Sequence, residues 1–121
     1  MSQQFTVRVP AQWWLTSNGR YHWADRARRT RALRAMAAAQ CRRLHIHTEA
    51  PVHVVAEITY RAGRVDPANA YPTIKAIVDG MTDAGVWPDD DSRWVIGPDM
   101  RRGLGRPKPR FHDVTITLEE I

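Results

Sequence analysis

Acidic side chains and one lysine are concentrated between Val65 and Ser92, in a chain that is basic overall. The groups there that could do chemistry are, in chain order, Asp66, Lys75, Asp79, Asp89, Asp90 and Asp91. Carboxylates gathered in one place repel one another, and a divalent metal ion facing a phosphate backbone would offset this repulsion. These residue types therefore suit metal-assisted hydrolysis of a phosphodiester, with the lysine orienting water or stabilising the pentavalent phosphate.

Each of these patterns also has an ordinary structural explanation. Lys75 and Asp79 stand four residues apart on a predicted helix, where a surface ion pair contributes under about 0.5 kcal/mol. The three consecutive aspartates, Asp89–Asp91, are compatible with a solvated turn. Asp66 and this run flank one predicted helix, so they meet only if the segments on both sides of it return to the same edge of the sheet. The sequence permits this arrangement without requiring it.

The hydrophobic periodicity predicts the elements that must position these groups. The predicted strands span residues 5–9, 52–60, 94–96 and 114–118, and the predicted helices span residues 25–44 and 72–85. Asp25 is predicted to cap the first helix, and Gly85 to end the second. The expected fold class is α/β (α+β): a single small domain over residues 1–121, with a mixed β-sheet of about four strands covered by two main helices. The strand–helix–strand order favours some parallel pairs.

The charge balance favours an anionic partner. Among 121 residues, 18 lysines and arginines stand against 13 acids, and the formal net charge is +5. Only Lys75 and Lys108 are lysines, so arginine supplies most of the positive charge. Arginine grips phosphate bidentately, which suits a nucleic acid. A basic domain without any nucleic-acid role has the same composition and is the alternative.

The single cysteine, Cys41, excludes an internal disulfide and a cysteine-based zinc site. Cys41 falls in a predicted helix and is expected to be a small buried hydrophobe. No run approaches the ~18 apolar residues of a membrane span, and the N-terminal residues contain no apolar signal-peptide stretch. We therefore expect no membrane partner and a cytoplasmic location.

Amide and guanidinium side chains outside the acidic stretch are the candidates for DNA contact. They are Asn18 and Arg20 in a loop, Arg26 and Arg29 early in the first helix, and Arg101 and Arg102 in a predicted mobile basic loop over residues 100–110. The charges of Arg26 and Arg29 oppose the helix dipole at a cost of about a few tenths of a kcal/mol each, which suggests phosphate contact. Trp13 and Trp14 could stack on bases, although such residues are more often packed beneath a loop.

The stretch from Arg64 to Asp91 resembles the RusA family of Holliday-junction resolvases. That family has an Asp-rich motif with an Asn after a strand, then a Lys with an Asp four residues on, an Ala-Gly helix end and a paired Asp. These features stand here as Asp66, Asn69, Lys75, Asp79, Ala84-Gly85 and Asp89-Asp90. The N-terminal strand, the loop with Asn18 and the arginine-rich helix are also similar to the family.

The resemblance implies a magnesium-dependent endonuclease, active as a small homodimer, that binds four-way DNA junctions by shape and nicks two strands symmetrically. Asp66 and Asp90 would be metal-binding catalytic acids, Asp89 would support them, and Lys75 would be the catalytic lysine. Asn69 would join the DNA-binding residues named above.

The chain departs from the family pattern at two places. Ala68 stands where the family has a second acid, and Lys75 follows Asn69 by six residues where three are usual. Asp79 is the candidate to replace the missing metal ligand, so the metal stoichiometry stays open. Two other functions also stay open: a non-catalytic DNA-binding protein on the same fold, and a protein-interaction module that binds no nucleic acid.

Overall fold

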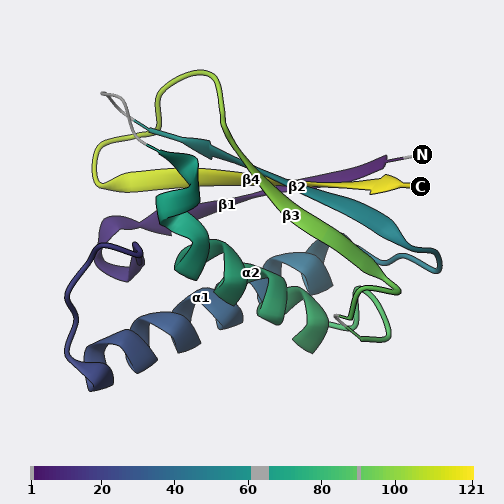
Figure 1. Cartoon of the computed structure of the whole chain (residues 1–121), viewed down its shortest axis with the longest axis horizontal. Helices are drawn as coiled ribbons and strands as arrows, with labels where there is room; N and C mark the ends of the chain where they lie inside the picture. Colours follow the sequence, from purple (N-terminus) through teal and green to yellow (C-terminus); the bar gives the residue numbers. More distant parts are fainter. Residues whose placement is uncertain (1, 61–65, 90) are drawn as a thin grey trace.

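The computed structural model describes residues 2–60, 66–89 and 91–121, in which four strands form one mixed sheet and two α-helices cover one of its faces (Figure 1). The elements in chain order are β1 (Ser2–Pro10), η1 (Ala11–Trp13), α1 (Trp23–Leu44), β2 (Val52–Thr59), η2 (Pro67–Ala70), α2 (Tyr71–Asp83), β3 (Val95–Arg102) and β4 (Phe111–Glu120). The fold class predicted from the sequence is confirmed, as a single small α+β domain. No helix in the described ranges combines the length and apolarity needed to cross a membrane.

The strand order in the sheet is β1-β4-β2-β3. β4 runs antiparallel to both β1 and β2, while β2 and β3 are parallel. Parallel neighbours need a crossover, and α2 supplies it between β2 and β3. This β2–α2–β3 unit decides the position of the acidic residues, because it separates the end of β2 from the start of β3 by the full length of a strand.

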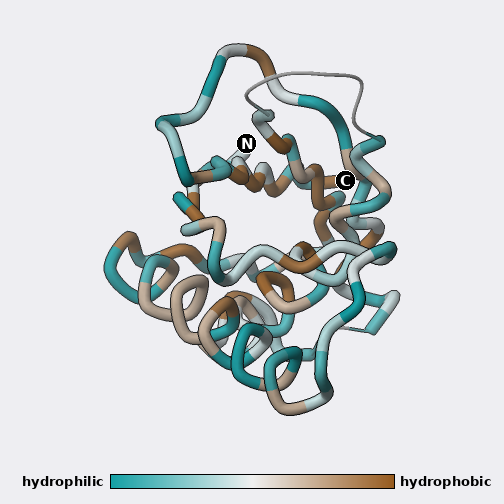
Figure 2. Tube along the Cα trace, turned by 90° about the vertical axis from the view of Figure 1, so that its left-hand side faces the viewer, coloured by the Kyte–Doolittle hydropathy of each residue, from teal (hydrophilic) through white to brown (hydrophobic). Residues whose placement is uncertain are grey.

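The core lies between the sheet and the two helices. It contains the loop residues Leu15 and Trp87, alternate strand residues and one face of each helix: Phe5, Val7, Val9, Val52, Val54, Ile58, Ile116, Leu118, Leu33, Cys41, Ile74, Ile77 and Met81. Each fully buried Val, Leu or Ile stabilises the fold by about 1.5–3 kcal/mol relative to an exposed one. In Figure 2 the connecting loops are mostly hydrophilic, as this arrangement requires. Cys41 is buried as expected, and burial raises the pKa of its thiol to about 12.

The start of α1 differs from the prediction. The helix begins at Trp23, and the Nδ1 atom of His22 accepts a hydrogen bond from the backbone N–H of Ala24. Asp25 is therefore not the cap: its carboxylate lies inside the first turn and pairs with Arg28 and Arg29. A carboxylate in this position still suits the positive end of the helix dipole.

The third strand is longer than predicted. β3 continues to Arg102, because parallel pairing with β2 supplies hydrogen bonds as far as Ile58. Gly97 and Pro98 interrupt its alternation of side chains, so the sequence pattern indicated only residues 94–96. Arg101 and Arg102 consequently belong to a strand, and the basic loop is limited to residues 103–110. Gly85 ends α2 in the left-handed conformation, at φ 76°, as predicted.

Candidate functional site

The two ends of the β2–β3 pair carry the predicted acids. Asp66 follows β2, which places it at the C-terminal end of this pair, and Asp89 and Asp91 precede β3 and lie at the N-terminal end. Figure 1 shows α2 running between these two ends. Eight strand residues span roughly 25 Å. Asp66 and Asp89 of one chain are therefore held apart and do not meet at one edge of the sheet. Asp90 and the predicted strand-ending Gly63 lie outside the described residues.

Asp66 stands in a turn that its own side chain stabilises. Its Oδ1 atom accepts a hydrogen bond of 3.0 Å from the backbone N–H of Ala68, and this caps η2. Burial, and after it the charge of Asp66, raises the pKa of Tyr60, while the charge of Arg102 opposes that shift. The Arg102 guanidinium lies 5.9 Å from the centre of the Tyr60 ring. An exposed acid and a cation thus both act on one buried tyrosine.

The loop that carries Asn18 is fixed against η2 and the start of α2. The Thr73 hydroxyl accepts a hydrogen bond from the N–H of Leu15 and donates one to its C=O, both at 2.8 Å and both buried. The backbone O and the side-chain Oδ1 of Asn69 accept from the N–H groups of Ser17 and Asn18. Asn69 and Thr73 together hold this loop beside Asp66. The sequence analysis did not identify Thr73. The one indication of its role is that a polar residue occupies a helix position that faces the core.

Arg29, a predicted DNA-binding residue, makes its contacts within the protein. Its guanidinium donates to the Trp14 C=O at 2.9 Å and to Asp25 at 3.0 Å, and it lies 4.9 Å from the centre of the Tyr21 ring. The hydrogen bond from Arg28, followed by the contribution of Arg29, lowers the pKa of Asp25. Arg29 therefore positions the loop next to it.

Other cations surround this end of the sheet, where β1 ends and β4 begins. Arg26 lies over Tyr21 at 5.2 Å and is partly buried. The exposed basic residues are Arg20, Arg101, Arg102, Arg106, Lys108 and Arg110. The C-terminal end of the β2–β3 pair is thus a basic surface with Asp66 at its edge, which suits contact with phosphate.

A cluster of aromatic rings closes the core beneath this surface. Trp14 is buried and stacks on His112 at 4.2 Å between ring centres, and Tyr60 meets both rings edge-on. The expectation that Trp14 is packed inside the protein, rather than exposed for stacking on bases, is confirmed. Burial lowers the pKa of His112, with partial compensation from Asp113. Its Nδ1 atom is buried and has no hydrogen-bond partner among the described residues.

Lys75 and Asp79 form the i, i+4 pair that their spacing indicates. The Lys75 Nζ atom donates to Asp79 Oδ1 at 2.6 Å on the exposed side of α2. Asp83 raises the pKa of Arg34 on α1, and the charge of Asp79 adds a smaller increase to that pKa. Asp79 therefore lies toward α1.

The N-terminal end of the β2–β3 pair is acidic, and its described acids are largely used in turns and pairs. Asp91 Oδ1 accepts from the Arg93 N–H at 2.9 Å, its Oδ2 pairs with the Arg93 guanidinium at 2.7 Å, and these bonds lower the pKa of Asp91. His53 lies between Asp99, at 2.6 Å, and Glu119, at 3.5 Å. Asp91 therefore acts as a turn residue, while Asp89 beside it is exposed.

Of the predicted metal-binding acids, the described part of one chain brings only Asp66 to the basic end. Across residues 2–60, 66–89 and 91–121, no three histidine, cysteine or acidic side chains are arranged to hold a metal ion. Magnesium usually keeps several waters and is bound through one or two carboxylates together with substrate phosphates, so it does not require a pre-formed cluster of three side chains.

Comparison with known proteins assigns neither a family nor a function to this chain. No protein-family model matches the chain, and no curated protein matches it. The resemblance to the RusA family rests on the ordered motif from Asp66 to Asp90 and stays a prediction.

Proposed function

We propose that this protein is a magnesium-dependent, structure-selective endonuclease that resolves four-way DNA junctions as a homodimer by symmetric phosphodiester cleavage. The observation that carries the proposal is the C-terminal end of the β2–β3 pair, where exposed Asp66 stands beside a basic surface and a fixed loop. Magnesium, when bound, would activate water and neutralise the charge that develops on phosphate. The choice of four-way junctions as the substrate rests on the resemblance of the motif from Asp66 to Asp90 to the RusA family.

The chain's own side chains have separate tasks in this proposal. Arg101 and Arg102, exposed at the end of β3, bind DNA phosphates on the side of Asp66. Asn69 holds Asn18 at the DNA surface through the loop. Lys75, half-exposed on α2, stabilises negative charge on the phosphate that is attacked.

The separation of the acids gives the proposed homodimer a specific task. Asp66 and Asp89 are roughly 25 Å apart in one chain, so a site that contains both ends needs a second copy. In a twofold pair, Asp66 of one copy would meet Asp89 of the other, the chain neighbour of Asp90, and this would happen twice. Two such composite sites match the two symmetric nicks. The basic end of one copy also attracts the acidic end of the other.

A mixed dimer tests this proposal. One copy carries Asp66→Asn and the other Asp90→Asn, and two different affinity tags isolate the mixed species. With composite sites, one site retains both acids and the other retains neither, so the mixed dimer nicks one strand of a junction. With sites made from one chain each, every site carries a substitution and no nick forms.

The wild-type protein provides the reference for that test. It is assayed on a synthetic four-way junction with and without magnesium, beside a linear duplex. Magnesium-dependent cleavage of the junction supports nuclease function. No cleavage of any substrate by folded protein rejects it.

One observation favours the alternative of a non-catalytic DNA-binding protein. Asp79 is paired with Lys75 and Asp91 with Arg93, which are structural uses of acids from the motif region. A binding protein would hold junction DNA through its arginines and need no magnesium. Calorimetry separates the two functions: after the heat of magnesium binding to the DNA alone is subtracted, no magnesium-linked heat, with or without junction DNA, favours the binding protein.

A further inference from the structure

The two edge strands of the described sheet are protected to different degrees. β3 pairs with β2 through a register shift between His53 and Val55, and Pro98 in its middle has no N–H to offer. β1 pairs with β4 in one continuous register over Ser2–Pro10. Long regular edges attract further strands unless bulges, prolines or charges prevent it. The β1 edge is the one that can accept a strand.

The open side of β1 is identified by one hydrogen bond. The Gln40 side-chain N–H donates to the backbone O of Thr6 at 3.2 Å, so this carbonyl points away from β4. Alternation then turns the N–H and C=O groups of Gln4, Thr6 and Arg8 to the open edge. The hydroxyls of Thr6 and Thr115 lie 2.9 Å apart, as expected where opposed residues do not exchange backbone bonds.

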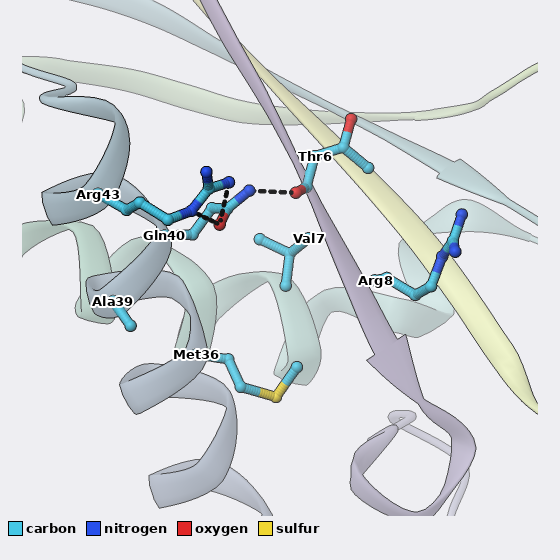
Figure 3. A pocket seen from close by; sticks show the side chains of 7 residues that line it. All are labelled: Thr6, Val7, Arg8, Met36, Ala39, Gln40 and Arg43. Carbon is cyan, nitrogen blue, oxygen red and sulfur yellow. Dashed lines mark hydrogen bonds between the residues drawn. The ribbon is translucent and has the colours of Figure 1, made fainter.

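A groove of about 390 Å³ runs beside this edge, between β1 and α1 (Figure 3). Met36 and Ala39 give it an apolar side. Gln40 and Arg43 stand at one end, with the Gln40 amide reaching across to Thr6. A strand added at β1 would therefore place alternate side chains over α1 and the others on the open face of the sheet.

The charges around the groove indicate the chemistry of such a strand. Arg8 and Arg43 are the charged residues among its described lining. The Arg43 guanidinium donates to the neutral amide oxygen of Gln40, at 3.0 and 3.3 Å, and Arg8 pairs with Asp113 on the open face. We propose that the β1 edge binds an extended acidic segment of another protein, which joins the sheet as an additional strand and places carboxylates beside Arg43.

This interaction does not depend on the nuclease proposal. β1 is at the opposite edge of the sheet from β3, so a segment bound there leaves Asp66, Arg101 and Arg102 accessible. The bound segment must displace the Gln40 amide from Thr6, and it gains bonds to the backbone of Gln4 and Arg8 in exchange. A partner could thus be held while the other edge contacts DNA.

The test uses a blocked, fluorescein-labelled peptide of about ten residues that alternates glutamate and valine, beside a lysine–valine counterpart. Fluorescence anisotropy should show at least about tenfold tighter binding of the acidic peptide, and Arg43→Glu should remove this preference. Arg31→Glu makes the same charge change on α1 outside the groove and should leave binding unchanged. Backbone amide shifts in NMR spectra should centre on Gln4, Thr6 and Arg8.

A second variant tests the edge itself. Thr6→Pro removes an outward N–H and leaves the bonds to β4 in place, which an edge strand tolerates. Folded Thr6→Pro should lose peptide binding. Three results would each overturn the proposal. The first is equal affinity for the acidic and the basic peptide, and the second is an equal loss of acidic-peptide affinity in Arg31→Glu and Arg43→Glu. The third is that folded Thr6→Pro binds the acidic peptide as tightly as the wild-type protein does. A wild-type dimer that Thr6→Pro converts to monomers in sedimentation also overturns it, because a second copy then occupies the edge.

Discussion

The two ends of the β2–β3 pair are built from the same strands and have opposite character. At the C-terminal end, Asp66 stands beside arginines and a loop that Asn69 and Thr73 hold in place. At the N-terminal end, acids outnumber bases, and Asp91 is tied to Arg93. The sequence places these acids within one short stretch, but a parallel crossover separates them by a strand length. Proximity in the chain is therefore a poor guide to a metal site when a β-α-β unit intervenes.

The largest expected effect distinguishes Asp66, a proposed metal ligand, from Asp91, which is bonded to Arg93 in a turn. Asp66→Asn removes a charge at the basic end and should reduce junction cleavage by more than about 100-fold, since loss of groups that merely orient metal ligands already costs about 10–100-fold. Junction binding should persist or tighten, because one anion near phosphate is gone. Asp91→Asn should retain most of the cleavage and lose some stability with the Arg93 pair. Equal loss of cleavage in both variants would contradict the distinction.

The second comparison concerns cations at the two ends. Replacement of Arg101 and Arg102 together by Ala should reduce the slope of log affinity against log salt by about 2, because each phosphate contact on duplex DNA contributes about 0.9. Arg93→Ala removes a cation at the acidic end and should leave the slope unchanged. Anisotropy of labelled junction DNA at several salt concentrations measures both. An unchanged slope in the double variant removes the end of β3 from the interface.

The third comparison sharpens the role of the fixed loop. Thr73→Val keeps the size of the side chain but leaves the buried N–H and C=O of Leu15 without their partner, which should cost about 1–3 kcal/mol of unfolding free energy. Thr30→Val, on the partly exposed part of α1, should change stability by less than about 0.5 kcal/mol. Urea unfolding followed by tryptophan fluorescence gives both values. Similar values for the two variants would mean that the loop is held by packing alone.

The smallest expected effect is a dependence of stability on pH at the basic end. The folded pKa of His112 lies below its ordinary value of 6.5, so the unfolded chain takes up a proton more readily. The stability that depends on neutral His112 is present above pH 6.5 and is lost as the pH falls through the lower, folded pKa. His112→Phe should therefore show a smaller drop in unfolding free energy between about pH 7.5 and about pH 5. His45→Asn, at the exposed end of α1, should retain the full drop; a full drop in both variants would contradict the assignment.

Most of the fold could be predicted from local patterns. The alternation in residues 52–60 and 114–118 and the apolar faces of both helices depend on periodicity alone, and the structure confirms them. The length of β3 was not predictable in this way, because Gly97 and Pro98 break the pattern and the pairing partner lies far off in the chain. The start of α1 was missed for a similar reason, since His22 is a less common cap than Asp25.

The candidate site could be predicted only in part. The sequence identified the acids and arginines as residue types, and the strand–helix–strand order contained the signal that Asp66 and Asp89 lie at opposite ends. The contacts of Thr73 and Arg29 with the backbone of Leu15 and Trp14 could not be read from the chain, because they join segments distant in sequence. Their existence depends on how the loop packs.

The central position of β4 has a consequence for the order in which the protein can fold. β4 lies between β1 and β2 and is the last described strand in chain order. While the chain is being synthesised, β1 and β2 are complete long before the strand that joins them has been made. Until Phe111–Glu120 emerges from the ribosome, both strands have unpaired backbone groups and exposed valines, a state that favours aggregation. The sheet must therefore close late, in a step that brings both ends of the described chain together.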